Sequence, residues 1–171
     1  TAWRNDPVTD MPAEAVYLRD EETAQIWSPT PLPAAGDTPV LVRHGHGYTV
    51  FEQHSRQLKQ TMTLFAATDA PVTIIRLRLE NTARRARRIT ATYYADWVLG
   101  TFKDVTQQYI IPEFYAAGQT LLFRNPYSID FGGQYAFVTA GQDFHGLTTD
   151  RTEFLGRLGD YARPAALERI G

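Results

Sequence analysis

The sequence predicts an all-β fold, a large antiparallel sandwich of two packed sheets. Short segments rich in β-branched and aromatic residues recur along the chain, Gly- and Pro-containing turns separate them, and helical periodicity is almost absent. Roughly ten strands at such regular spacing are typical of a sandwich or a barrel. The 171 residues fit one β-sandwich domain, 1–171, which is large enough to bury a hydrophobic core.

The first half of the chain predicts a hairpin and then a series of long strands. The hairpin surrounds the acidic turn DEET, and Gly45 and Gly47 indicate a bend or bulge in the long strand that follows. In LKQTMTLFAA and PVTIIRLRLEN apolar and polar side chains alternate, so each segment predicts a strand with one buried face. The predicted strands are 15–19, 25–28, 38–53, 58–67, 71–81 and 87–100.

The second half predicts shorter strands and at most one short helix. Turn signals such as AAG, NPY, GG and GQD separate the strands. The strands are expected at 109–114, 119–124, 134–140 and 144–148. The best candidate for a helix is 162–170, with a bend at Pro164.

Composition excludes several classes of function. The net charge is −2 and charged residues make up 21% of the chain, so no global field attracts nucleic acid or an anionic membrane. There is no cysteine, and therefore no disulfide framework or thiolate metal site. No apolar run approaches the length of a membrane span, so direct membrane insertion is not expected. The N-terminus lacks a signal peptide and an initiator Met, which indicates a soluble piece of a longer chain.

The histidines are weak candidates for a metal site. His44 and His46 face the same side of a strand, where a third ligand from His54, Glu52 or His145 would complete a zinc or iron site. The spacing is not distinctive, and the neighbouring glycines fit imidazoles that face solvent. We therefore expect no metal, and a metal-dependent β-barrel enzyme is the least favoured hypothesis.

Two groups of acids are candidates for general acid–base chemistry. Asp20, Glu21 and Glu22 are consecutive in a predicted turn, where a solvated turn tip is the favoured interpretation. Asp96 lies within the aromatic segment TYYADWVLG, where a structural ion pair is favoured over catalysis. The candidate partners of Asp96 are Arg76, Arg78 and the arginines within 84–88.

The segment ARRARR, residues 83–88, contains four arginines in six positions. Arginines can contact phosphates, but single-stranded nucleic acid also needs interleaved aromatic side chains, which this segment lacks. A hairpin turn with its charges on a solvated rim or against a neighbouring domain is favoured. No nucleophile elbow, phosphate-binding Gly-rich loop or Cys–His pair occurs in the chain. The residues alone therefore indicate a soluble β-sandwich without catalytic residues.

Four longer stretches together resemble a known family. They are RNDPVTDMPAEAVYLRDEETAQIWSPTPLP, VRHGHGYTVFEQHS, ITATYYADWVLG and DRTEFLGRLGDYARPAAL. Over essentially the whole chain, the sequence resembles the N-terminal β-supersandwich domain of glycoside hydrolase family 94, formerly glycosyltransferase family 36. Within that family it is most similar to the phosphorylase-like region of NdvB-type cyclic β-1,2-glucan synthases. The resemblance implies a galactose-mutarotase-like supersandwich, of which this chain is an incomplete part.

The resemblance also implies a parent protein that is larger than this chain. Family members are inverting phosphorylases of β-linked glucosides with inorganic phosphate as co-substrate, and a catalytic (α/α)₆ barrel carries their general acid. This chain shows no such barrel, so we expect a fragment that is inactive alone and needs no cofactor. Its expected function is to support the barrel, the assembly and the sugar site. The parent is expected at the cytoplasmic face of the bacterial inner membrane.

The expected partners are a β-linked glucan or oligosaccharide, the barrel of the same protein and a second copy in a homodimer. The resemblance places the loop 98–109, VLGTFKDVTQQY, near the sugar site, where polar groups bind hydroxyls and an aromatic ring stacks on a sugar. The candidate sugar contacts are Lys103, Asp104, Thr106, Gln107, Gln108 and Tyr109. A mobile surface loop is the alternative interpretation.

An independent carbohydrate-binding module is the alternative function. Such a module presents a planar row of exposed aromatic side chains. The candidates for this row are Trp27, Tyr48, Trp97, Tyr109 and Tyr115. Burial of most of these side chains would exclude the module.

Overall fold

The computed structural model describes residues 1, 8 and 10–169. Among these residues strands predominate and pair in antiparallel register, so the all-β antiparallel fold class is confirmed. The strands of the first half are β1 (Glu14–Asp20), β2 (Ile26–Trp27), β3 (Leu41–Gly45), β4 (Tyr48–Ser55), β5 (Leu58–Ala66), β6 (Thr73–Asn81) and β7 (Ile89–Ala95).

The second half mixes short strands with short helical segments. In chain order these are α1 (Lys103–Thr106), η1 (Gln107–Tyr109), β8 (Ile111–Tyr115), η2 (Ala116–Gly118), β9 (Thr120–Arg124), β10 (Ala136–Thr139), α2 (Arg151–Leu155) and α3 (Ala165–Glu168). No described helical segment exceeds five residues. Segments of this length are too short to leave a helical period in the sequence.

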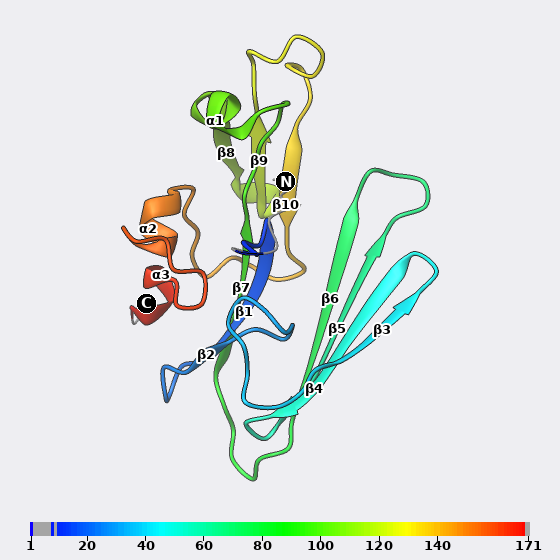
Figure 1. Cartoon of the computed structure of the whole chain (residues 1–171), viewed down its shortest axis with the longest axis vertical. Helices are drawn as coiled ribbons and strands as arrows, with labels where there is room; N and C mark the ends of the chain where they lie inside the picture. The colour runs from blue at the N-terminus through cyan, green and yellow to red at the C-terminus, as the bar shows by residue number, and fades with distance from the viewer. Residues whose placement is uncertain (2–7, 9, 170–171) are drawn as a thin grey trace. The chain divides into compact units, whose positions relative to one another are not determined.

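The described strands form three sheets, where the sequence predicts two large ones. Their strand orders are β2-β1-β7, β3-β4-β5-β6 and β10-β9-β8. The backbone groups into two compact units: unit 1 comprises Thr1–Glu14 and Ala95–Phe154, and unit 2 comprises Ala15–Tyr94 and Leu155–Gly171. Figure 1 shows β3 to β6 side by side as one meander, and β8, β9 and β10 together in another sheet. The single-domain organisation stays a prediction.

Two sheets of unit 2 share one hydrophobic core. Leu18 of β1, Trp27 of β2 and Leu58 of β5 are at most 2% exposed and lie in one cluster. The partly buried side chains packed against this cluster are Leu77, Leu79 and Ile89. Complete burial of a side chain such as Leu contributes roughly 1.5–3 kcal/mol. Because this core joins strands of two sheets, unit 2 is a β-sandwich.

The four-stranded sheet of unit 2 separates an apolar face from a charged face. One row of cross-strand partners on the apolar face consists of Val42, Phe51, Met62 and Leu77. Arg76 and Arg78 of β6 lie on the opposite face, because successive residues of a strand alternate. The predicted buried face of β5 is confirmed, since Leu58, Gln60 and Met62 are buried whereas Lys59 is exposed.

The long strand expected at 38–53 is a hairpin made of β3 and β4. Gly45 aligns with Tyr48, so His46 and Gly47 form a two-residue turn. Gly47 has a φ of +78°, which residues with a Cβ rarely adopt. A Cβ on Gly45 would lie 2.1 Å from Cζ of Tyr48, because the ring lies against this glycine. The two glycines therefore mark a tight turn and not a bend or bulge in one strand.

Other element boundaries also differ from the sequence expectations. Strand β7 ends at Ala95 and does not continue to residue 100. The segment 144–148 forms no strand, and the amide of Phe144 donates to the side chain of Gln119 at 3.0 Å. The expected helix 162–170 is limited to α3, which begins directly after Pro164; residue 170 lies outside the described residues.

Candidate functional site

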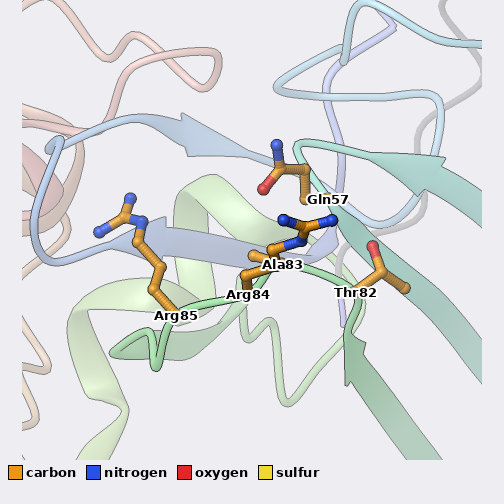
Figure 2. Close-up of a pocket in the computed structure, with 5 residues that line it drawn as sticks. All are labelled: Gln57, Thr82, Ala83, Arg84 and Arg85. Carbon is orange, nitrogen blue, oxygen red and sulfur yellow. The ribbon is translucent and has the colours of Figure 1, made fainter.

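A hollow of about 530 Å³ lies among the turns of unit 2, and we call it the turn hollow (Figure 2). Its lining residues are Gln57, Thr82, Ala83, Arg84 and Arg85. Gln57 comes from the turn between β4 and β5, and the other four come from the turn between β6 and β7. Arg84 and Arg85 are exposed, and Arg85 forms an ion pair with Glu22.

Asp20, beside these turns, is buried and held by a cation. It is 1% exposed, and its Oδ2 accepts hydrogen bonds from Nη2 of Arg87 and, at 3.2 Å, from Nε. Its Oδ1 accepts hydrogen bonds from the amides of Glu22 and Thr23, at 2.8 and 3.3 Å. The expectation of a solvated tip is therefore wrong for Asp20, because Arg87 and two amides satisfy its carboxylate inside the protein.

The neighbouring acids have arginine partners as well. Glu21 forms an ion pair with Arg19, and Glu22 forms one with Arg85. The arginines of the segment 83–88 are thus divided: Arg87 is buried against Asp20, whereas Arg85 lies at the surface with its acid. The acidic turn 20–22 and the arginine segment 83–88 are therefore joined by two ion pairs, which is a structural arrangement.

Asp96 forms the structural ion pair that the sequence predicts, but with a different partner. Its carboxylate pairs with the ammonium of Lys103, and Asp96 is 7% exposed. The predicted partners were arginines. Lys103 follows Asp96 by seven residues, so the turn at the start of α1 brings the ammonium back to the carboxylate. One of the six candidate sugar contacts therefore already holds a buried acid.

Three other candidate sugar contacts take part in interactions near the loop 98–109. Thr106 Oγ1 donates to the carbonyl of Phe102 at 2.9 Å, and Gln108 Nε2 donates to that of Val105 at 3.1 Å. The ring of Tyr109 lies 4.7 Å from that of Tyr127, centroid to centroid. These contacts shape the loop.

Asp104 and Gln107 complete the set of candidates. Both are exposed, and the part of the chain that the structure describes provides no hydrogen bond to either side chain. They are the candidates with polar groups available to an external ligand. The sugar-contact role of all six residues stays a prediction.

A second hollow, of about 260 Å³, lies in unit 1 and is called the loop pocket below. Its lining residues are Leu99, Gly100, Asn125, Ser128, Phe131, Gln134, Tyr135 and Ala136. Leu99 and Gly100 belong to the loop 98–109, whereas most of the others belong to the connection 125–135 between β9 and β10. The six candidate sugar contacts do not line it, although they share its loop.

The sequence contains a signal for this pocket that strand and turn patterns alone do not reveal. The connection NPYSIDFGGQY is longer than a usual hairpin loop and rich in aromatic and amide side chains. Long ordered connections in compact domains are often functional. Its NPY and GG motifs indicate turns, and an interpretation based on turns alone takes no account of its aromatic side chains.

His44 and His54, two of the candidate metal ligands, do not lie together. His44 contacts Thr49 Oγ1 at 3.0 Å, and His54 contacts Thr82 Oγ1 at 3.3 Å. Because Thr49 and His54 are five positions apart on β4, the two imidazoles lie on opposite faces of the sheet. Within residues 1, 8 and 10–169, no three His, Asp or Glu side chains are grouped in a way that could hold a metal ion.

The aromatic side chains proposed for a binding row have different environments. Trp27 is 0% exposed and donates its indole N–H to Gln60 at 2.9 Å, so it belongs to the core. Trp97 is half-buried against Phe123, with ring centroids 5.1 Å apart. The exposed members are Tyr48, Tyr109 and Tyr115. Tyr48 lies in unit 2, whereas Tyr109 and Tyr115 lie in unit 1. The three exposed side chains therefore do not form one row on a single unit.

Comparison with known proteins gives matches over the whole chain. The family described as glycosyl hydrolase 94, supersandwich domain, matches residues 1–171. The cyclic beta-(1,2)-glucan synthase NdvB of Rhizobium meliloti (strain 1021) is 33% identical over 168 residues, which cover 98% of this chain and 6% of the relative. The N,N'-diacetylchitobiose phosphorylase of Vibrio furnissii is 30% identical over 178 residues, covering 98% of this chain and 22% of the relative.

A third relative points the same way. The N,N'-diacetylchitobiose phosphorylase of Vibrio proteolyticus is 26% identical over 180 residues, which cover 99% of this chain and 22% of the relative. The chain thus spans less than a quarter of the length of each of these relatives. Over the described residues, no helix has the length and apolar character that a membrane span requires. The match across residues 1–171 shows that this chain belongs to the glycosyl hydrolase 94 supersandwich domain family.

Proposed function

We propose that the chain is the non-catalytic β-sandwich part of a β-glucan-processing synthase or phosphorylase. The observation that carries the proposal is the family match over residues 1–171, together with relatives of which this chain spans only 6% and 22%. The sandwich supports a catalytic (α/α)₆ barrel of the same protein, contributes to assembly as a homodimer, and presents the loop 98–109 to the sugar. Inorganic phosphate is a co-substrate of the whole protein and not of this chain alone. The whole protein acts at the cytoplasmic face of the bacterial inner membrane.

The buried acids support a non-catalytic role. Asp20 is enclosed by Arg87 and two backbone amides, and Asp96 is paired with Lys103. A general acid has to face the bond that it helps to cleave, with a second acid or a water opposite. Carboxylates whose oxygens are occupied by partners inside the protein serve the fold instead.

An activity assay tests the proposal. The chain is incubated with β-1,2-glucan or cellobiose and inorganic phosphate, and glucose 1-phosphate is measured. We expect no release above a protein-free control. The Vibrio furnissii phosphorylase, incubated with N,N'-diacetylchitobiose and phosphate, is the positive control for sugar phosphate release. Glucose 1-phosphate production by the chain alone would contradict a non-catalytic role.

An independent carbohydrate-binding module is the second candidate function. Exposed Tyr109 and Tyr115 in unit 1 favour it, at 38% and 58% exposure, whereas complete burial of Trp27 argues against it. A module binds its sugar without the rest of the protein. Titration calorimetry with sophorose and longer β-1,2-glucans separates the two functions. Affinity tighter than about 1 mM, which corresponds to a binding free energy of about −4 kcal/mol, would favour the module.

A further inference from the structure

We propose that the loop pocket is a subsite for one uncharged pyranose ring of a glucan chain. The choice of a glucan rests on the proposed function, whereas the preference for an uncharged sugar ring follows from the residues of the pocket. The pocket lies entirely within unit 1. It is distinct from the turn hollow of unit 2, which is lined by arginines.

A buried amide holds the two sides of the loop pocket together. Asn125 is 4% exposed, and its Nδ2 donates to the carbonyl of Leu99 at 3.0 Å. Its Oδ1 accepts the amide of Tyr127 at 3.1 Å, and its carbonyl accepts the amide of Ser128 at 3.1 Å. One residue therefore fixes the loop 98–109 against the connection 125–135. A site held in this way exists before ligand arrives, which reduces the entropic cost of binding.

Among the residues that the structure describes, those that line the loop pocket include no Lys, Arg, Asp, Glu or His. It instead contains hydroxyl and amide groups that can both donate and accept hydrogen bonds. The hydroxyl of Ser128 accepts the amide of Phe131 at 3.2 Å and retains its own proton for donation. Gln134 adds an amide, and Tyr135 adds a phenol. A ligand with several hydroxyls and no charge satisfies this set, because none of the described lining side chains offers a positive charge to an anion.

Aromatic rings supply the apolar part of the same pocket. Phe131 and Tyr135 are 60% and 49% exposed, so both rings present a surface to solvent. The guanidinium of Arg124 lies 6.0 Å from the centroid of the Tyr135 ring. Arg124 is not one of the lining residues, and its contact orients the ring of Tyr135. A pyranose ring has an apolar face of C–H groups beside its hydroxyls, so it matches a pocket that combines rings with amides.

The volume limits how much sugar the pocket can take. Its 260 Å³ lies just below the roughly 300–1,000 Å³ of typical small-molecule sites. A volume of this size suits one ring of a chain whose neighbouring rings extend into solvent. Affinity is then expected to be weak, because a single ring makes few contacts.

Mapping of sugar binding by NMR tests the proposal on the unmodified chain. Sophorose is titrated into the ¹⁵N-labelled protein, and amide shifts are followed. We expect saturable shifts at the amides of Gly100, Ser128, Gln134 and Tyr135. Phosphate alone is the second probe and is expected to leave these amides unchanged. Absence of shifts at sophorose concentrations up to roughly 0.1 M, or shifts located only elsewhere, would overturn the proposal.

Two variants and a matched control test the residues. Gln134→Ala and Tyr135→Ala are each expected to weaken sophorose binding about fivefold or more, the effect of losing one net hydrogen bond. Phe114→Ala is the control, because Phe114 is 43% exposed on β8 and pairs with Leu121, towards the other end of the same sheet. It is expected to leave the affinity unchanged. Equal loss in all three variants would contradict a site in the loop pocket.

The outcome is separable from that of the proposed function. Release of glucose 1-phosphate by the chain would contradict the non-catalytic role but would not affect the mapped site. Conversely, a chain that is inactive and shows no shifts in the loop pocket retains the proposed function and loses the subsite. If a variant fails to fold, the shifts of the unmodified chain still decide the question.

Discussion

The ion pair between Asp20 and Arg87 illustrates how single residues stabilise unit 2. Both side chains are at most 7% exposed, and Arg87 also donates to the carbonyl of Arg56. Removal of one partner from a buried pair leaves the other charge uncompensated. An exposed pair contributes little by comparison, because water screens it.

Substitution Asp20→Ala is expected to lower the free energy of unfolding by about 3–5 kcal/mol. The matched control is Asp37→Ala, which removes a 70% exposed partner of Arg56 and is expected to cost less than about 1 kcal/mol. Urea denaturation of the three proteins measures the difference. Similar losses for the two variants would show that the buried pair contributes no more than a surface pair.

Tyr17 connects stability to pH. The residue is 0% exposed and its hydroxyl donates to the carbonyl of Tyr161 at 2.9 Å. Burial, followed by the nearby Tyr161 and Asp160, raises the pKa of Tyr17 far above its ordinary value of 10.0. The folded protein therefore retains this proton when the unfolded chain loses it. The resulting stability is present below pH 10.0 and falls as the pH rises above that value.

Substitution Tyr17→Phe isolates this contribution. At about pH 8 the variant is expected to be less stable by about 0.5–1.5 kcal/mol, because the hydrogen bond is lost. Above pH 10.0 only the unmodified protein loses the additional stability, so the two free energies of unfolding converge. Urea midpoints at both pH values measure this. A difference that does not change with pH would contradict the raised pKa.

At the scale of elements, the two tight turns of the four-stranded meander differ in sequence. The turn between β3 and β4 has Gly47 at a φ of +78°, whereas the turn between β4 and β5 has Arg56 and Gln57 at +51° and +57°. Residues with a Cβ pay roughly 1–2 kcal/mol in this region. Arg56 has compensating contacts, since it pairs with Asp37 and lies 5.0 Å from the Trp27 ring. The side chain of Gln57 lines the turn hollow.

Exchanging residue types between these turns is expected to have opposite effects. Gln57→Gly relieves backbone strain and is expected to raise the free energy of unfolding by about 1 kcal/mol. Gly47→Gln introduces the strain and is expected to lower it by about the same amount. No atom lies within 4 Å of a Cβ built on Gly47, so the second effect is free of steric clashes. Thermal or urea unfolding measures both, and changes of the same sign would contradict the strain argument.

The elements themselves were predictable where side chains alternate over many residues. Strands β5 and β6 each extend over nine residues, and their alternation defines both the strand and its buried face. The hairpin turn at His46 and Gly47 was not predictable, because a Gly-X-Gly segment fits a bulge as well as a turn. The segment 144–148 was predicted as a strand, but no strand forms there, and the amide of Phe144 donates to the side chain of Gln119.

The two units of the whole molecule differ in how much hydrophobic surface they bury. Most of the described buried hydrophobic residues belong to unit 2, whereas unit 1 contributes Phe123 and Phe154. Unit 1 exposes many aromatic side chains, among them Tyr127 at 74% and Phe131 at 60%. Fewer buried apolar contacts mean lower local stability. Unit 1 is therefore expected to open before unit 2.

Tryptophan fluorescence tests this order, because Trp27 lies in unit 2 and Trp97 in unit 1. Two single-tryptophan variants are prepared in which Trp3 and one of the other two are replaced by Phe. The variant that retains Trp97 is expected to show its transition at lower urea concentration. Far-UV circular dichroism of each variant is the control for changes caused by the substitutions. Coincident transitions by both probes would indicate one cooperative unit.

The candidate site was predictable only in part. The loop 98–109 was identified from the sequence and supplies Leu99 and Gly100 to the loop pocket, but none of the six candidate sugar contacts lines this pocket. Gln134 and Tyr135 come from a connection more than 20 residues away in sequence, and only the fold brings them to the same pocket. Asp96 shows a similar limit, because a structural ion pair was predicted but its partner depended on where α1 begins.

The buried ion pair also has a consequence for how fast the protein folds and unfolds. Asp20 and Arg87 are 67 residues apart, whereas the strands β3 to β6 pair with their neighbours in sequence. Local pairing costs less chain entropy, so the meander is expected to form first and the ion pair after the transition state. Asp20→Ala is then expected to accelerate unfolding and to leave the refolding rate nearly unchanged in stopped-flow measurements. A slower refolding rate would show that the ion pair belongs to the folding nucleus. If only unfolding becomes faster, the ion pair determines the lifetime of the folded state.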